Sequence, residues 1–597
     1  MGHEKACISE QAVGTQLTWD LTLALYLRGL SPRSRFDIPP AMALGLLGQL
    51  LLAVVGTLFA YLVAHALQIT YENLTSPLRR ILHSPPIPNY LLGNFKETAD
   101  DPRLSAKWEQ MYGQTFLLHG LLSVNEVQTS DLKALNHIMA HPATYERSRT
   151  FQDLSRRLFG DGILTAILDQ HKRQRRVLVR IVPSLVRRRT NDVQNPAFGT
   201  AQVKLLTEIF IERSIELRDF WTSEIAKAKG DSSATVEISS GLRKMTLNVI
   251  GQAGFGYDFD ALNPHGKSSE LNEAFKEIFH SPSSRFYSGI FLLQSMVPIL
   301  KLLPLPGSGV MVNARGRMDD VGRRIIKGSK AALMGRDNKT APGRDLLSIL
   351  MKANMSADLP ESQKLSEEEV LGQIPAFFVA GHETTSTATT WALHALSLHP
   401  DVQQTLREEL LSVGTDNPTL DELSALPYLE KVIREVMRRH SPVVWMQRRA
   451  LADDVLPLGK PIVGRDGKEH SFLPIRKGQI MRLPIVEVNT SEDVWGPDAL
   501  EFRPDRWDNV PAAASSVPSV WANQFTFLAG PHNCIGFRFA LAELKALLFT
   551  LVRAFEITPA VPKESIGPVT SGQIQTPAVL KDKYGAGLPV VLTPVRG

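Results

Sequence analysis

Cysteine is almost absent from this sequence, which has only Cys7 and Cys534 among its 597 residues. Two cysteines cannot build a disulfide scaffold or a zinc site made of several cysteines. Their scarcity favours a location on the reducing side of a membrane. It also leaves Cys534 as the single cysteine in the main body of the chain.

A strong excess of one charge is also absent. The 66 Lys and Arg residues outnumber the 61 Asp and Glu residues only slightly, for a net charge of +5. This balance argues against a dedicated nucleic-acid-binding protein, which would carry a clustered basic face. Hydrophobic residues make up 43% and charged residues 21% of the chain, which excludes intrinsic disorder and collagen-like repeats.

One long run without charge lies near the N-terminus, in residues 41–64. As a helix it would be about 36 Å long, enough to cross the ~30 Å hydrocarbon core of a bilayer. We therefore predict a transmembrane anchor at residues 41–66, in preference to a buried core helix or a cleaved signal peptide. Basic residues occur on both sides of the run, so the positive-inside rule does not decide its orientation.

The segments around this anchor differ in character. Residues 1–40 do not resemble the start of a membrane protein, and Met42 would be a natural initiator, so we expect the true start to lie there. Residues 67–90 are rich in proline, which predicts a stiff, extended connector. A second apolar stretch, Ile290–Leu305, is interrupted by two prolines and cannot span a membrane. An interfacial loop and a part of the core are both open interpretations of that stretch.

Residues 91–597 show no clean linker and no internal repeat, so we interpret them as one domain. Long apolar-periodic patterns predict helices over Leu365–Leu398 and over Glu422–Arg439, the second entered through Thr419 and Asp421 as possible caps.

Strand-like patterns occur only in the last third of the chain, in Val455–Ile485 around a turn at Arg465–Gly467 and again in Leu588–Val595. The predicted fold class is therefore mainly α with a minor β portion.

The surroundings of Cys534 are the most informative part of the sequence. Residues 525–540 read FTFLAGPHNCIGFRFA, with Phe527, Gly530, His532 and Gly536 around the cysteine and a helix expected from Phe537. Glycines let a loop aim backbone N–H groups at one sulfur, and a helix N-terminus favours thiolate over thiol. Such a thiolate can be the axial ligand of a haem iron. A buried structural cysteine and a nucleophilic cysteine are the alternatives, and the spacings favour the haem ligand over both.

This loop resembles the haem-binding loop of the cytochrome P450 family, and the resemblance covers roughly residues 85–597. It implies a cytochrome P450 fold behind an N-terminal transmembrane helix. It implies that Cys534 ligates the iron of heme b and that His532 faces a haem propionate. Phe527 and Gly530 complete the cofactor-binding loop by the same resemblance.

The segment from Ala380 to Thr385 reads AGHETT within the long predicted helix, and it resembles the oxygen-activation segment of the family. The resemblance makes Glu383 and Thr384 the acid–alcohol pair that relays protons to iron-bound dioxygen, and it places Gly381 where room is needed beside the iron. On helix propensity alone, a polar helix face at a packing seam is the alternative.

Two further sets of charged residues support the resemblance. Glu435 and Arg438 are spaced i and i+3 on one helix face and can pair, and the family pattern adds Arg506 as the third member of a structural triad. His171 and Arg175 occupy the place of the family's W-x-x-x-R segment, with His171 in place of the usual tryptophan. Both would bind the propionates together with Arg448 or Arg449, and spacing favours Arg448. A solvated basic helix face is the alternative for His171 and Arg175.

Residues 179–194 separate this basic segment from Asn195-Pro196-Ala197-Phe198, which the family places almost directly after it. The sixteen residues are either a genuine basic loop or a translated intron, and we favour the intron.

The resemblance implies a membrane-bound monooxygenase in the endoplasmic reticulum membrane, with one span and a cytosolic catalytic domain. No flavin or dinucleotide motif appears, so electrons would come from an NADPH-cytochrome P450 reductase, with cytochrome b5 as a further candidate donor. No nucleic acid is expected as a partner. A haem-thiolate isomerase or dehydratase that needs no reductase and a non-catalytic membrane haem sensor are the alternatives.

The substrate is expected to be an apolar small molecule, because the pocket residues implied by the resemblance carry no charge. A terpenoid secondary metabolite is the first expectation, since the motif style resembles fungal members of the family. A fatty acid or a xenobiotic is the alternative. The implied pocket residues are Phe377, Phe378, Gly381, Val443, Val444, Trp445 and Met446.

Overall fold

The computed structural model describes residues 40–179, 197–227, 233–263, 284–297, 299–300, 308–334, 344–357, 359–580 and 587–595. Two predicted segments lie outside the described residues. They are the tail 1–40, of which only Pro40 is described, and the segment 179–194, of which only Val179 is described. The chain forms two compact units, residues 1–68 and residues 69–597.

Helix α2, Pro40–Thr75, carries the predicted anchor. Its part Gly48–Thr75 is the one helix of the described residues that is long and apolar enough to cross a membrane. The helix continues beyond the predicted end at residue 66, because the next proline is Pro77. A short helix, α3 at Leu78–Ile81, follows. The prediction of an extended connector over residues 67–90 is therefore wrong for its first half, and the longest irregular part is residues 82–90.

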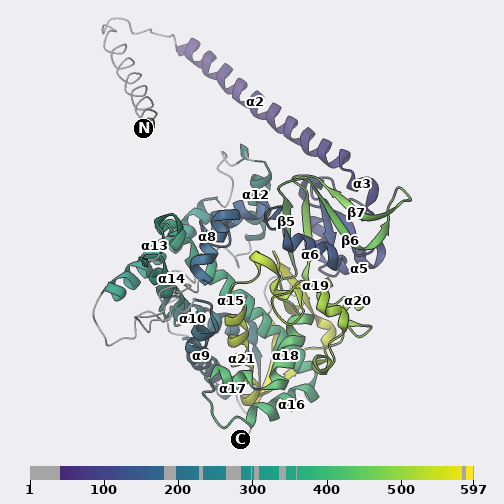
Figure 1. Cartoon of the computed structure of the whole chain (residues 1–597). Helices are drawn as coiled ribbons and strands as arrows, with labels where there is room; N and C mark the ends of the chain where they lie inside the picture. Colours follow the sequence, from purple (N-terminus) through teal and green to yellow (C-terminus); the bar gives the residue numbers. More distant parts are fainter. Residues whose placement is uncertain are drawn as a thin grey trace, which may run out of the picture. The chain divides into compact units, whose positions relative to one another are not determined.

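The second unit is mainly helical, as predicted (Figure 1). Its longer helices in the first half of the chain are α5 Leu104–Tyr112, α6 Leu132–Ala140, α7 Arg149–Phe159, α8 Leu168–Val179, α9 Thr200–Lys227, α10 Ile238–Phe255 and α12 Ser284–Met296. Those in the second half are α13 Ser308–Met334, α14 Leu346–Met355, α15 Glu367–Leu398, α16 Pro400–Leu411, α18 Pro427–Arg439 and α21 Phe537–Ala554. Four short helices complete the set, α4 Phe95–Asp100, α17 Leu420–Ser424, α19 Ile485–Asn489 and α20 Glu492–Trp495.

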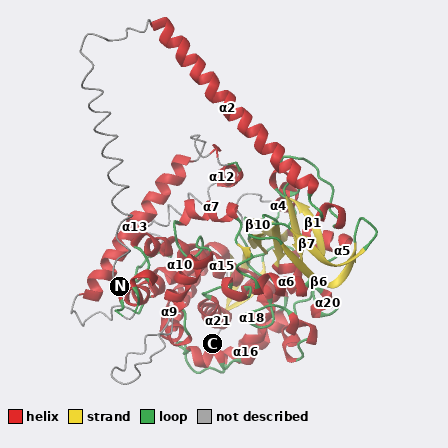
Figure 2. Cartoon of the chain, turned by 45° about the horizontal axis from the view of Figure 1, so that its top comes forward, coloured by secondary structure: helices red, strands yellow, loops and turns green. Residues whose placement is uncertain are grey.

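The strands of the described residues form four small sheets, and Figure 2 shows β1, β6 and β7 gathered on one side of the body beside α5 and α6. The largest sheet has the order β1-β2-β8-β5-β3, built from Thr115–His119, Asn125–Thr129, Ile480–Pro484, Trp445–Ala450 and Tyr145–Glu146. The others pair β6 with β7, β10 with β11, and β12 with β4 and β9. Their bounds are β6 Asp454–Val463, β7 Glu469–Ile475, β10 Ile566–Ser571, β11 Ile574–Val579, β12 Pro589–Pro594, β4 Ala234–Glu237 and β9 Phe555–Pro559.

The predicted strands at residues 455–485 and 588–595 are confirmed. The prediction that strands occur only in the last third is wrong, because β1 to β4 lie in the first half. These strands have two to five residues, too few for alternation to identify them.

The helix predicted over Glu422–Arg439 is broken into α17 and α18, because Pro427 begins a new helix and lacks the N–H that a continuous helix would need. Thr419 caps α17 in a capping box with Glu422, whereas Asp421 lies inside the first turn. In the apolar stretch from residue 290, Phe291 and Val297 are buried, so the described part packs as core.

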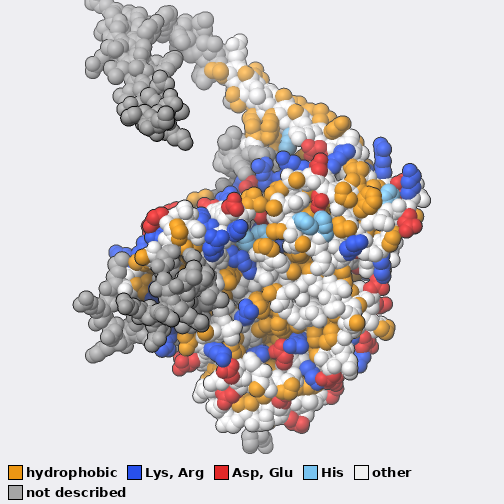
Figure 3. Space-filling model, in the orientation of Figure 1, with side chains coloured by type: hydrophobic (Ala, Val, Ile, Leu, Met, Phe, Trp, Pro, Cys, Tyr) orange, Lys and Arg blue, Asp and Glu red, His pale blue; other side chains and the backbone are white. Residues whose placement is uncertain are grey.

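Helix α15 runs through the body and is buried along most of its length. It packs against α10 and α21, which brings the 380–385 segment next to the helix that follows Cys534. On the face drawn in Figure 3, Lys and Arg side chains are interspersed with Asp and Glu.

Candidate functional site

The loop that carries Cys534 is fixed by its own backbone. It contains two short 3-10 turns, Phe525–Phe527 and Gly530–His532, and it leads into α21. The N–H of Cys534 donates to the carbonyl of Phe527 over 2.9 Å. Gly530 has a φ of +66°, and a Cβ at this position would lie 2.6 Å from the carbonyl oxygen of Met139. Glycine is therefore required here both by the backbone angle and by the close approach of α6.

Cys534 is exposed at its side chain although protein surrounds it. This burial raises the pKa of its thiol. Both observations hold if the exposed surface borders an enclosed space. A hydrogen bond from the Gly536 N–H and the charge of Arg175 act to lower the pKa. We expected the helix N-terminus to favour the thiolate. In the protein without a bound metal, burial has the larger effect and raises the pKa of the thiol.

Helix α15 supplies the polar residues predicted for proton transfer. Ala380 is exposed although the helix around it is largely buried, so α15 also borders an open space here. The hydroxyl of Thr384 donates to the carbonyl of Ala380 over 2.6 Å. The carboxylate of Glu383 lies 3.2 Å from Nε2 of His382. Both predicted residues lie close to the exposed Ala380 on α15, and His382 contacts the Phe378 carbonyl through Nδ1.

Three of the predicted pocket residues have other surroundings. A Cβ on Gly381 would lie 2.8 Å from Ile250, so this glycine lets α10 pack closely against α15. Phe378 is fully buried against the rings of Phe255 and Phe259. The ring of Trp445 lies over the guanidinium of Arg482, 4.4 Å away.

Trp445 and Arg448 are three residues apart on β5 and therefore point to opposite faces of the sheet. Phe377 and Val444 are buried, and Val443 and Met446 are half-buried. Phe377 packs on Phe198 in an edge-to-face contact of 5.5 Å.

A cluster of positive and titratable side chains meets beside the loop. The rings of His171 and His532 are 4.0 Å apart. Arg175 donates to the backbone carbonyl and the side-chain oxygen of Asn533. Burial, with the nearby His532, lowers the pKa of His171 to about 2. The structure thus brings α8 and the cysteine loop together, and His171 is not on a solvated face.

Arg448 and the unpredicted Arg147 add two buried guanidinium groups. Arg448 is 1% exposed and Arg147 is 9% exposed. Burial lowers the pKa of each to about 10. Arg449, the other candidate for binding a propionate, is half-buried on the opposite face of β5. Arg448, and not Arg449, therefore belongs to the positive cluster beside the cysteine loop.

Glu146 is the carboxylate that balances this cluster in part. Its Oε1 lies 3.0 Å from Nε2 of His532. Burial acts to raise its pKa, but hydrogen bonds from His532 and two backbone N–H groups hold the pKa at about 2. Nε2 of His171 and Nδ1 of His532 are buried without a hydrogen-bond partner among the described residues. The guanidinium groups of Arg147, Arg175 and Arg448 thus meet one carboxylate, and this excess of positive charge fits an anionic group.

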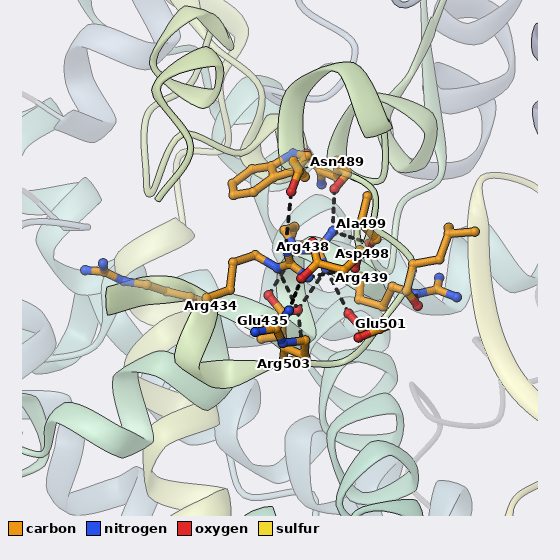
Figure 4. Close-up of polar contacts among 12 residues, drawn as sticks. Arg434, Glu435, Arg438, Arg439, Asn489, Asp498, Ala499, Glu501 and Arg503 are labelled. Atoms are coloured by element: carbon orange, nitrogen blue, oxygen red, sulfur yellow. Dashed lines mark hydrogen bonds and ion pairs between the residues drawn. The ribbon is translucent and has the colours of Figure 1, made fainter. Parts of the chain in front are cut away.

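The predicted triad forms a buried network (Figure 4). Nε and Nη2 of Arg438 donate to the two carboxylate oxygens of Glu435 over 2.9 and 2.8 Å. Arg506 approaches Glu435 at 3.4 Å, and Trp507 donates its indole N–H to the same carboxylate. Arg438 and Glu435 have no exposed side-chain surface. The three residues hold the segment from 489 to 507 against α18.

Sequence reasoning missed Glu146, Arg147 and Glu543. Glu146 ends β3 and Arg147 lies between β3 and α7, in a segment without a recognisable local pattern. Glu543 lies nine residues after Cys534 on α21 and is 1% exposed. Its position on the helix that follows the predicted ligand was the one signal available.

Comparison with known proteins gives a consistent result. Residues 83–581 match the model of the family described as Cytochrome P450. The chain is 43% identical to cytochrome P450 monooxygenase 205 of Postia placenta, over 90% of this chain and 96% of that relative. It is 43% identical to cytochrome P450 monooxygenase 128 of the same organism, over 89% and 95%. It is also 32% identical to a ganoderic acid synthetase of Ganoderma lucidum, over 80% and 88%.

Proposed function

The chain belongs to the cytochrome P450 family of monooxygenases, and we propose that it is a membrane-bound haem-thiolate enzyme that oxidises an apolar secondary metabolite of the terpenoid class. It inserts one atom of dioxygen into the substrate, and the other leaves as water. The observation that carries this proposal is the meeting of a glycine-shaped cysteine loop with buried guanidinium groups that one carboxylate balances only in part. The charge of Arg175 acts on Cys534, and His171 and Arg448 lie close to His532 of the same loop.

The residues present fit heme b. Cys534 would hold the iron through Sγ, and the positive cluster would hold the two propionates. The unpartnered Nε2 of His171 can donate to a propionate oxygen when the ring carries its hydrogen there. Charge-assisted hydrogen bonds of this kind are stronger than neutral ones. Burying guanidinium groups next to only one carboxylate is unfavourable unless an anion completes the pairing.

The chain's own residues then manage protons and exclude water. When bound, the haem would supply the oxidising chemistry, and the thiolate of Cys534 would hold its iron. Thr384 holds a proton at Oγ1 at the border of the open space, where its partner is the Ala380 carbonyl. Glu383, beside His382, is the acid that replaces a proton given up by Thr384. Positioned groups of this type are the usual general acids in enzymes.

The substrate class is inferred from the lining of the space and from a relative. Phe377 and Val444 are apolar and buried, which suits a hydrocarbon skeleton. A relative whose name gives it a role in making ganoderic acid supports a secondary-metabolite substrate. Electrons would come from an NADPH-cytochrome P450 reductase, with cytochrome b5 as a further donor. Helix α2 supports an anchor in the endoplasmic reticulum membrane with the body in the cytosol.

The experiment is reconstitution of the full chain in membranes with the reductase, NADPH, dioxygen and a panel of terpenoids and fatty acids. We expect an oxygenated terpenoid that forms only when NADPH is present. Conversion without NADPH would instead indicate an isomerase or dehydratase. A correct haem spectrum without any turnover would support a haem sensor, and preferred oxidation of fatty acids would contradict the terpenoid assignment.

The propionate assignment has its own matched pair of variants. Arg448→Ala removes a buried guanidinium of the cluster, whereas Arg449→Ala removes its half-buried neighbour on the other face of β5. We expect Arg448→Ala to lower the haem bound per polypeptide and Arg449→Ala to leave it at the wild-type level. Equal haem content in the two variants would contradict the assignment.

A further inference from the structure

Asn489 is the last residue of α19. Its backbone carbonyl and its side-chain amide connect the Glu435–Arg438 pair with the loop that carries Cys534. Its backbone carbonyl accepts a hydrogen bond from Nη1 of Arg438 over 2.9 Å, as Figure 4 shows. Its side-chain Oδ1 accepts from the N–H of Phe525 over 2.7 Å. Its side-chain Nδ2 donates to the hydroxyl of Thr526 over 2.7 Å. The residue has no exposed surface.

One end of this connection is the Glu435–Arg438 ion pair. Arg438 is held at both Nε and Nη2 by Glu435, and its Nη1 also donates to the carbonyl of Ala499 over 2.7 Å. A buried, bidentate pair with further hydrogen bonds has one favoured geometry. The Asn489 carbonyl is therefore attached to a fixed point.

The other end is the loop that carries Cys534. Phe525 and Thr526 begin the 3-10 turn that ends at Phe527, and the Phe527 carbonyl accepts the N–H of Cys534. Thr526 also donates its hydroxyl hydrogen to the carbonyl of Met437 on α18 over 2.9 Å. Arg438 is therefore connected to the N–H of Cys534 through Asn489, Phe525 and Phe527. Each step is a hydrogen bond, except for the two peptide bonds that lead from Phe525 to Phe527.

We propose that Asn489 is a positioning residue that ties the Glu435–Arg438 pair to the Cys534 loop and thereby holds Cys534 in the position from which it ligates the haem iron. This assignment rests on the proposed haem-thiolate function. Without the amide, the Phe525 N–H is buried without a partner, and the first turn of the loop can shift. Gln524 still donates to the carbonyl of Arg434 over 2.8 Å, so the loop stays attached to α18. The position of Cys534 relative to the iron is then less well fixed.

The test compares Asn489→Leu with Asn248→Leu in the full-length chain in membranes. Asn248 on α10 is equally unexposed, and its Oδ1 likewise accepts one backbone N–H, from Ala261 over 2.9 Å. Three quantities are measured: haem per polypeptide, the midpoint of thermal unfolding, and the ratio of neutral-thiol to thiolate forms in the spectrum of the reduced carbon-monoxide complex.

We expect both variants to lower the unfolding midpoint. We expect Asn489→Leu alone to raise the neutral-thiol to thiolate ratio, by about tenfold, which corresponds to one lost buried hydrogen bond. An unchanged ratio in Asn489→Leu, or an equal change in Asn248→Leu, would overturn the assignment.

A second pair of variants keeps the test decisive if Asn489→Leu does not fold. Thr526→Val removes the hydroxyl that Asn489 contacts, and Thr526→Ser restores it. We expect the ratio to rise in Thr526→Val and to return toward the wild-type value in Thr526→Ser. No difference between these two variants would contradict the assignment. A wild-type chain that lacks the thiolate spectrum would instead contradict the proposed function itself, and the assignment with it.

Discussion

The carboxylate of Glu435 accepts hydrogen bonds from Nε and Nη2 of Arg438, and neither side chain has any exposed surface. Removal of one partner leaves a buried charge without compensation, which costs about 3–5 kcal/mol. We therefore predict that Arg438→Ala lowers the free energy of unfolding by this amount and prevents stable haem incorporation. Chemical denaturation and haem content of the purified variant measure both effects.

The control is an ion pair on the surface. Lys204 and Asp421 lie 2.7 Å apart, but their side chains are 45% and 73% exposed. Water and salt screen such a pair, so Lys204→Ala should change neither stability nor haem content measurably. A similar loss in both variants would mean that burial does not explain the importance of Arg438.

Gly530 gives a second prediction, with Gly467 as its control. Both have a positive φ, +66° and +74°, but a Cβ on Gly530 would lie 2.6 Å from the Met139 carbonyl oxygen and a Cβ on Gly467 would meet nothing within 4 Å. Gly467→Ala should cost only the backbone strain of about 1–2 kcal/mol. Gly530→Ala should cost more and should abolish haem binding, because the loop must move away from α6. Comparable unfolding free energies for the two variants would count against this description of the loop.

Thr384 and Thr389 allow a test of the proton-transfer role within one helix. Each hydroxyl donates to the carbonyl four residues earlier, over 2.6 and 2.9 Å, but Thr389 is fully buried. In Thr384→Val, NADPH consumption should continue while the fraction that yields oxygenated product falls, by on the order of tenfold or more. Thr389→Val should retain the wild-type ratio of product to NADPH. A retained ratio in Thr384→Val would remove Thr384 from the mechanism.

The buried carboxyl of Glu543 makes a pH-dependent contribution to stability. Neither of its oxygens has a hydrogen bond of normal geometry among the described residues. Burial, offset only in part by the nearby Thr385 hydroxyl, raises its pKa well above the usual 4.5. The unfolded chain loses this proton near its ordinary pKa while the folded chain keeps it, so stability falls as the pH rises above about 4.5.

Glu543→Gln keeps the shape of the side chain and removes the titration. We expect the variant to be more stable than the wild type at pH 7, with the difference vanishing as the pH falls to about 4. Unfolding free energies measured across this range test the sign. A variant that is less stable at pH 7 would show that the carboxylate is ionised and paired in the folded protein.

The sequence predicted the parts of the site that depend on local pattern. The cysteine loop, the long helix around residues 380–385 and the i, i+3 pair at Glu435 and Arg438 follow from spacing and from the family resemblance. Residues that reach the site from elsewhere did not carry such a signal. Glu146 meets His532 only through the tertiary fold, and its own neighbourhood contains no recognisable pattern.

The fold, too, could be predicted where it follows a local pattern and not where it depends on tertiary contacts. Pro427 was visible in the sequence, but the apolar period on both sides of it suggested one helix where there are two. Gly381 was read as space beside the iron because the resemblance suggested that role, whereas the contact with Ile250 depends on how α10 crosses α15. Side-chain direction on a buried helix is decided by its neighbours, which spacing alone does not identify.

The most direct test of the account is the difference spectrum of the reduced, carbon-monoxide-bound full-length protein in membranes, recorded for the wild type and for Cys534→Ser. We predict a strongly red-shifted Soret band in the wild type that is lost in Cys534→Ser, because the proposed function makes the thiolate of Cys534 the ligand of the haem iron. A red-shifted band that survives in Cys534→Ser, or a wild-type band typical of histidine-ligated haem, would contradict the account.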